Sequence, residues 1–179
     1  MSVEKQKGLI IVHTGPGKGK TTAAMGMALR GAGHHLKSLM IQFIKGSWKY
    51  GELEAAKALH PYFEIVPMGK GFIHFEKAGP DKKDLEAVSK AWECFERNVS
   101  SKDYYMIILD EINVAIYFGL LPLEPVLQAL KEKPSGLHLV LTGRNAPPEI
   151  MDLADLVTEM TEVKHPFKNG VPAQKGVEF

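Results

Sequence analysis

The sequence contains very little cysteine and no excess of either charge. Cys94 is the only cysteine among 179 residues, so no disulfide can form within the chain, and no Cys and His spacing suits a zinc site. The 22 basic and 21 acidic residues leave a formal net charge of +1, which gives no general attraction to nucleic acid or to an anionic membrane. We therefore expect a protein of a reducing compartment whose partners include neither nucleic acid nor a membrane.

Long apolar runs are also absent. No segment approaches the roughly 20 residues of a membrane span, and the polar segment Met1–Lys7 lacks the apolar core of a signal peptide. We therefore predict a cytoplasmic protein. With 45% hydrophobic residues the chain can bury a substantial core, and its length predicts one domain over residues 1–179. Within it, we expect a flexible N-terminus at 1–7 and a tail at 164–179 that packs near the site.

Short apolar segments alternate with helix patterns along the chain. They are apolar on both faces, which is typical of strands that helices cover on each side of a parallel sheet. The expected strands are Leu9–Val12, Ser38–Ile44, Phe63–Met68, Tyr105–Leu109 and Leu137–Leu141, with a weaker sixth at Leu156–Val163. The expected helices are Lys20–Gly33, Asp81–Ser100 and a shorter one through Leu123 and Leu130. This alternation predicts an α/β fold with a doubly wound, mainly parallel sheet of about five to six strands, and ligands outside the carboxyl ends of the strands.

A glycine-rich turn joins the first expected strand to the first helix. It reads Thr14-Gly-Pro-Gly-Lys-Gly-Lys-Thr-Thr22, in the strand-to-helix context of a phosphate-binding loop. Its glycines let backbone N–H groups converge on an anion, Lys20 adds a positive charge, and the hydroxyl of Thr21 can bind Mg²⁺. The first glycine of the usual pattern is replaced by Thr14 and displaced to Gly15. The residues expected to bind ATP here are Gly15, Pro16, Gly17, Lys18, Gly19, Lys20, Thr21 and Thr22.

Two carboxylates follow the fourth expected strand. Asp110 and Glu111 end an apolar run, which delivers them to the sheet edge where the phosphates are expected. Either can hold Mg²⁺ (or Mn²⁺) or its waters together with Thr21, because these ions prefer hard oxygen ligands. The loop and the acidic strand end together predict a P-loop NTPase of RecA-like architecture, but a fold does not by itself define a reaction.

Further sequence blocks narrow the reaction. They are Gln42-Phe-Ile-Lys-Gly-Ser-Trp48, Asp110-Glu-Ile-Asn-Val-Ala115, Gly119-Leu-Leu-Pro-Leu123, Leu141-Thr-Gly-Arg-Asn145, Asp152-Leu-Ala-Asp155 and Val163-Lys-His-Pro-Phe167. With the variant phosphate loop, this order of blocks resembles the ATP:corrinoid adenosyltransferase family over nearly the whole chain. The resemblance implies an enzyme that transfers the 5′-deoxyadenosyl group of ATP to the cobalt of a reduced Co(I) corrinoid and releases triphosphate.

The resemblance also implies catalytic roles on the ATP side. Lys20, together with a metal ion held by Thr21 and by Asp110 or Glu111, is expected to stabilise the leaving triphosphate. Glu111 is expected to be a partner of the metal or of the ribose, because Co(I) carries no proton for a general base to remove. The catalytic residues implied in this way are Lys20, Thr21 and Glu111.

On the corrinoid side the implied contacts are fewer. The family places aromatic residues of a Gly-Phe-x-Trp stretch against the corrinoid, and this chain reads Gly71-Phe-Ile-His74. Phe72 is therefore a candidate corrinoid contact, and His74 is either a second contact or an exposed loop residue. Arg144 is expected to reach a phosphate or a corrinoid amide, or to pair with a surface carboxylate such as Asp152.

The resemblance further implies a homodimer and a partner that supplies the electron, such as a reduced flavoprotein. Two other functions fit the same residues: a P-loop ATPase or small-molecule kinase, and a non-catalytic, ATP-gated protein that delivers a corrinoid. Their products separate the three, because only the transferase forms a cobalt–carbon bond and triphosphate.

Overall fold

A computed structural model of the chain describes residues 7–46, 50–71 and 81–179. In these residues, six parallel strands form one sheet in the order β3-β2-β4-β5-β1-β6. The strands are β1 (Ile10–Thr14), β2 (Ser38–Gln42), β3 (Phe63–Pro67), β4 (Met106–Asp110), β5 (His138–Thr142) and β6 (Leu156–Glu159). The predicted doubly wound parallel sheet is confirmed, and all of its strands end at one edge.

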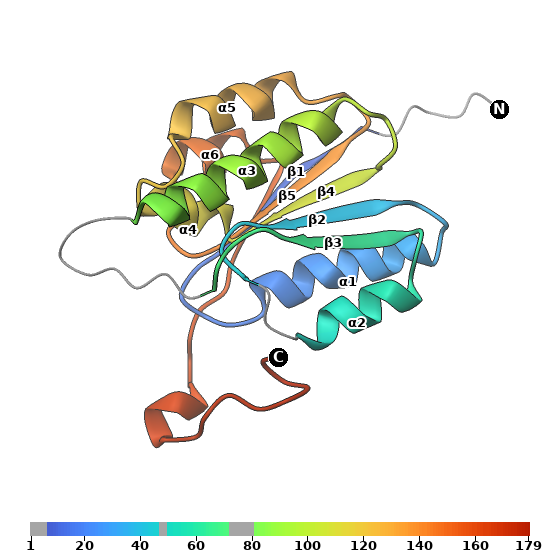
Figure 1. Cartoon of the computed structure of the whole chain (residues 1–179). Coiled ribbons are helices and arrows are strands. Elements are labelled where there is room, and N and C mark those ends of the chain that lie inside the picture. The colour runs from blue at the N-terminus through green and yellow to red at the C-terminus, as the bar shows by residue number, and fades with distance from the viewer. Residues whose placement is uncertain (1–6, 47–49, 72–80) are drawn as a thin grey trace.

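Helices cover both faces of the sheet (Figure 1). One face carries α1 (Lys20–Ala32) and α2 (Gly51–Ala58). The other face carries α3 (Lys82–Val99), α4 (Ile112–Tyr117), α5 (Leu123–Glu132) and α6 (Pro148–Leu153). A short 3₁₀ helix, η1 (Pro166–Asn169), follows the last strand. None of the helices in the described part of the chain has both the length and the apolar character that a membrane span requires.

The sheet separates two apolar cores. On the α1 side, the small residues Ala24 and Ala28 are fully buried, which lets the helix pack closely on Ile11 and Ile108. On the opposite side, the buried face of α3, which includes Trp92, packs on the strand residues whose side chains point to that face of the sheet. The close contact of α1 with the sheet fixes the N-terminus of this helix at the carboxyl end of β1.

The last strand ends earlier than its sequence pattern suggested. The weaker sixth segment was expected to extend to Val163, but β6 ends at Glu159. The chain then passes over the turn that follows β1: Met160 N–H donates to Thr14 O at 2.9 Å, and Gly17 N–H donates to Met160 O at 2.6 Å. These bonds end the strand pairing and hold the turn in place.

Candidate active site

The turn between β1 and α1 is shaped by glycines. Gly15 and Gly19 adopt φ values of 92° and 107°, in the left-handed region that favours glycine. A Cβ atom at Gly15 would lie 2.6 Å from Met160 O, so a side chain there would also collide with backbone. Position 14 can carry a side chain because it is still in the strand, and the buried hydroxyl of Thr14 accepts a hydrogen bond from Ala146 N–H at 3.2 Å. The structure thus accommodates Thr14 at the end of the strand and requires glycine at position 15.

Lys20 is the first residue of α1 and is buried, with 7% of its surface exposed. Its ammonium group donates hydrogen bonds to the carbonyl oxygens of Gly15, at 2.9 Å, and of Gly17. Burial lowers the pKa of Lys20, and the negative charge of Glu111 partly opposes this effect. The structure therefore holds one positive charge inside the loop, at the N-terminus of a helix.

Asp110 lies at the end of β4 and is completely buried. Its Oδ1 atom accepts hydrogen bonds from the hydroxyls of Thr21 and Thr142, each at 2.8 Å. Its Oδ2 atom lies 3.4 Å from the Gln42 amide nitrogen and 3.9 Å from the Lys45 ammonium nitrogen. The carboxylate thus ties the phosphate loop to β2, β4 and β5 from beneath.

Glu111 follows Asp110 in a left-handed conformation, with φ 63°. Its N–H donates to the hydroxyl of Thr142 at 2.9 Å, while its side chain lines the pocket above. Burial, and then the neighbouring charge of Asp110, raise the pKa of Glu111 to about 7. Gly143 faces it, and a Cβ at that position would lie 3.3 Å from Glu111 Oε2. Near neutral pH, Glu111 is therefore present in both protonation states.

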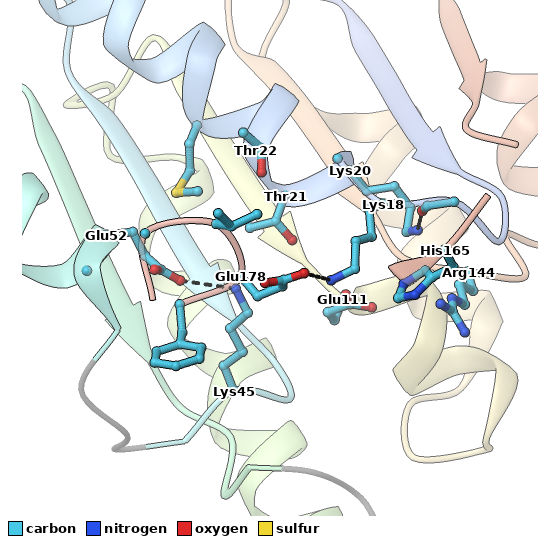
Figure 2. Close-up of a pocket in the computed structure, with 17 residues that line it drawn as sticks. Lys18, Lys20, Thr21, Thr22, Lys45, Glu52, Glu111, Arg144, His165 and Glu178 are labelled. Atoms are coloured by element: carbon cyan, nitrogen blue, oxygen red, sulfur yellow. Dashed lines mark hydrogen bonds and ion pairs between the residues drawn. The ribbon is translucent and has the colours of Figure 1, made fainter. Parts of the chain in front are cut away.

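A pocket of about 740 Å³ opens above these groups. Figure 2 shows side chains of α1, of the segment after β2, of Glu111 and of the chain after β6 surrounding it. Its lining consists of Gly17, Lys18, Gly19, Lys20, Thr21, Thr22, Met25, Lys45, Gly51, Glu52, Glu111, Arg144, His165, Gly176, Val177, Glu178 and Phe179. The structure thus brings the phosphate loop, Glu111 and Arg144 together at the carboxyl ends of the strands.

Not every candidate residue lines this pocket. Gly15 and Pro16 belong to the loop but are not part of the lining, and Asp110 lies beneath it. Arg144 is exposed, and the structure records no ion pair between it and Asp152, both of which are described. Phe72 and His74 lie outside the described residues.

Lys45 and Glu52 were not singled out from the sequence. The Lys45 ammonium nitrogen lies 3.1 Å from Glu52 Oε1, and both side chains line the pocket (Figure 2). Burial lowers the pKa of Lys45, but the negative charges of Asp110 and Glu52 outweigh it and raise the pKa overall. The available signal was position: Lys45 follows the end of β2, which lies beside β4 in the sheet.

The residues around Asp110 have the chemistry of a site for Mg²⁺. Thr21 and Asp110 offer hard oxygen atoms, and Gln42 Oε1 is buried without a hydrogen-bond partner among the described residues. In the same part of the chain, no group of three or more His, Cys, Asp or Glu side chains could hold a metal ion alone. This donor set fits Mg²⁺ bound together with substrate phosphates, because the ion commonly takes one or two carboxylates and completes its shell with phosphate oxygens and water.

The matching family model and the relatives of similar sequence carry the same description. Residues 6–179 match the family described as ATP:corrinoid adenosyltransferase BtuR/CobO/CobP. A corrinoid adenosyltransferase from Sinorhizobium sp is 42% identical over 176 residues, which cover 97% of this chain and 81% of that protein. Its counterpart from Escherichia coli K12 is 40% identical over 177 residues, or 98% and 88% of the two chains. A KaiC-like protein from Pyrococcus horikoshii OT3 has a TM-score of 0.48 at 16% identity, covering 88% of this chain and 75% of that one.

Proposed function

This chain belongs to the ATP:corrinoid adenosyltransferase family, and from that premise we propose how its own residues carry out the transfer. The enzyme moves the 5′-deoxyadenosyl group of ATP to the cobalt of a reduced corrinoid. The electron pair of Co(I) forms the new bond to C5′, and the C5′–O bond breaks with its electrons passing to the oxygen. That oxygen leaves as part of triphosphate, so the protein must stabilise the negative charge that grows there.

The observation that carries the proposal is the arrangement of donors at the phosphate loop. Lys20, the N-terminus of α1 and the backbone from Gly17 to Thr22 all face one pocket. These groups are fixed before substrate binds, because the contact with Met160 and the bond from Thr21 to Asp110 hold the loop. Preorganised donors of this kind stabilise a developing anion without reorganisation, which is commonly the largest contribution to catalysis.

We assign the metal site to Thr21 and Asp110. The two side chains lie within hydrogen-bond distance of each other, so their oxygen atoms would together hold one ion or its waters. When bound, Mg²⁺ (or Mn²⁺) supplies positive charge to the phosphate oxygens. The hydroxyl of Thr142 keeps the same Asp110 oxygen in place from the opposite side.

Glu111 then remains available for the nucleoside. Its side chain lines the pocket, whereas Asp110 lies beneath it, so the two neighbouring carboxylates face different surroundings. We propose that ionised Glu111 accepts a hydrogen bond from a ribose hydroxyl and orients C5′ for attack. Attack by Co(I) releases no proton, so this role requires no proton transfer.

The corrinoid contacts and partners are proposals as well. We propose that Arg144, which is exposed and lines the pocket, binds a phosphate or a corrinoid amide. Phe72 and His74 are proposed to contact the corrinoid, as the family's aromatic stretch suggests. A homodimer, a reduced flavoprotein or another electron donor, and a cytoplasmic location complete the proposal. Light scattering at several protein concentrations tests the dimer directly.

A single-turnover reaction tests the function. Chemically reduced cobalamin is mixed with MgATP and the protein under anaerobic conditions, and the absorbance change and the phosphorus products are recorded together. Adenosylated cobalamin and triphosphate in equal amounts support the transferase. ADP, with or without phosphate, supports an ATPase or kinase, and binding of both ligands without products supports a delivery protein.

A further inference from the structure

The segment Gln174–Phe179 folds back into the nucleotide pocket. Gly176 N–H donates to Phe179 O at 2.8 Å, and Glu178 N–H donates to Gln174 O at 2.9 Å, so the segment forms a compact turn. Its residues from Gly176 to Phe179 line the same pocket as the phosphate loop. In Figure 1 this part of the chain lies away from the sheet, near the start of α1.

Glu178 places a carboxylate against the loop. Its Oε1 atom lies 3.2 Å from the ammonium nitrogen of Lys18, and its Oε2 atom accepts a hydrogen bond from Gln174 N–H at 2.7 Å. Figure 2 marks the ion pair with Lys18 by a dashed line. The bond from Gln174 and then the charge of Lys18 hold the pKa of Glu178 below its usual range. The side chain is 14% exposed and that of Lys18 is 50% exposed. The carboxylate is thus ionised and held, while Lys18 keeps a face open to an incoming anion.

The Glu178 carboxylate lies beside Lys18, where a phosphate group of ATP is expected, and both groups are negatively charged. A glycine-rich loop at a helix N-terminus binds anions of many kinds, because its N–H groups and helix dipole favour negative charge. Glu178 and a polyphosphate therefore have the same preference for Lys18. Because like charges repel in a pocket of limited volume, the two are not expected to bind Lys18 together.

We propose that Glu178 is a specificity-determining residue that competes with the polyphosphate for Lys18. As a tethered competitor it is present at high effective concentration, so it lowers the apparent affinity of every ligand that needs Lys18. A strongly anionic ligand such as a triphosphate displaces it, and weakly anionic ligands do not. With respect to turnover the inference rests on the proposed function: Glu178 returns to Lys18 when triphosphate leaves, and so favours product release.

The test measures binding of inorganic tripolyphosphate by calorimetry, without nucleoside or corrinoid. The E178Q variant is expected to bind tripolyphosphate about 3- to 10-fold more tightly than the unchanged protein. E162Q is the matched control, since Glu162 pairs with Lys168 and is not part of the pocket lining. Its affinity is expected to equal that of the unchanged protein.

A double-mutant cycle with Lys18→Ala identifies the cation involved. If Glu178 acts through Lys18, E178Q changes the affinity of the Lys18→Ala protein little or not at all. Equal or weaker binding by E178Q, or a gain that persists without Lys18, would overturn the proposal. Because the readout needs no adenosyl transfer, a protein that fails to adenosylate corrinoids but shows this pattern would disprove the proposed function and leave the competition standing.

Discussion

The hydroxyl of Thr21, at the start of α1, donates a 2.8 Å hydrogen bond to Asp110, at the end of β4, across 89 positions of the sequence. In the sheet, β5 and β1 follow β4 in order, so this bond joins the phosphate loop to a strand that is not its neighbour. It sets the distance between the groups that face the phosphates and the carboxylate beneath them. We regard it as the structural basis of the proposed metal site.

Replacing Thr21 by Val should therefore remove a proposed metal ligand while keeping the side-chain shape. We expect the adenosylation rate to fall by about 10²-fold or more, since a preorganised charge is lost from the leaving group. The Mg²⁺ concentration needed for half-maximal rate should rise. Titration of the single-turnover rate with Mg²⁺ checks both effects.

Thr142→Val is the control for that experiment. It also removes a donor to Asp110 Oδ1, and the Glu111 N–H loses its acceptor, but it takes away no proposed metal ligand. Its free energy of unfolding should fall by about 1 to 3 kcal/mol, the usual cost of a buried polar group left unpaired. If Thr21→Val kept the unchanged protein's Mg²⁺ dependence, or Thr142→Val shifted it more, the metal assignment would be wrong.

Lys20→Ala should nearly abolish the reaction. The buried ammonium group is the fixed charge closest to the loop backbone, and its loss should reduce the rate by about 10²- to 10³-fold or more. Single-turnover formation of the adenosylated corrinoid measures this. Lys57→Ala serves as the comparison, because Lys57 is exposed on α2 and pairs with Glu54 outside the pocket. Comparable rates for the two variants would remove Lys20 from the mechanism.

Glu111→Gln should stabilise the protein at neutral and alkaline pH. The pKa of Glu111 is raised in the folded state to about 7 from its ordinary value of 4.5, so the folded protein binds this proton more tightly than the unfolded chain does. The stabilising contribution is complete below pH 4.5 and is lost as the pH rises through 7. Relative to Gln, Glu111 should then cost about 3 kcal/mol above pH 7 and almost nothing at pH 4.5.

Denaturant unfolding of both proteins between pH 4.5 and pH 8 provides the measurement. A difference in unfolding free energy that does not change with pH would show that Glu111 is not buried as described. The same variant should lose activity chiefly above pH 7, where the unchanged protein carries the ionised carboxylate that the neutral amide lacks, and the difference in rate between the two proteins should shrink as the pH falls below 7.

His13→Phe should reduce the loss of folding stability that the protein suffers as the pH falls. Both ring nitrogens of His13 are buried without a hydrogen-bond partner in the described part of the chain, and burial lowers the pKa of the ring. Since the folded pKa is depressed, the unfolded chain binds the proton first, and stability is lost as the pH falls below about 6.5. The His13→Phe variant should therefore keep more of its unfolding free energy than the unchanged protein between pH 7 and pH 5. If the unfolding free energies of the two proteins changed equally with pH, His13 would not be a source of this pH dependence.

The sequence predicted the sheet well because buried parallel strands have a strong signature. Its apolar segments correspond to β1 to β6 with shifts of one or two residues at most ends, and Lys20–Gly33 corresponds closely to α1. The pattern missed α2, α4 and α6. The helix α4 has only six residues, almost all apolar, so its sequence shows no helical repeat of apolar and polar positions. The helix α2 buries only one residue, Ala56, so it has no apolar stripe that would identify it.

The site was predictable where one motif carries it. The Gly-Lys-Thr of the loop and the acidic end of β4 can be recognised from the residues next to them in the sequence. Lys45 and Glu178 cannot be recognised in this way. Each lies in the pocket because of a contact with a residue distant in sequence, Asp110 for Lys45 and Lys18 for Glu178. Strand order and the return of the segment after β6 create these pairs, and neither is encoded in a short pattern.

The central claim is that the C5′–O bond of ATP breaks, so that the 5′ oxygen leaves with triphosphate. ATP carrying ¹⁸O at the oxygen between C5′ and the α-phosphorus tests it in one turnover with reduced cobalamin. We predict that mass spectrometry finds the label in triphosphate and none in a nucleoside product. Label retained in ADP, AMP or adenosine would show cleavage at phosphorus and would contradict the mechanism.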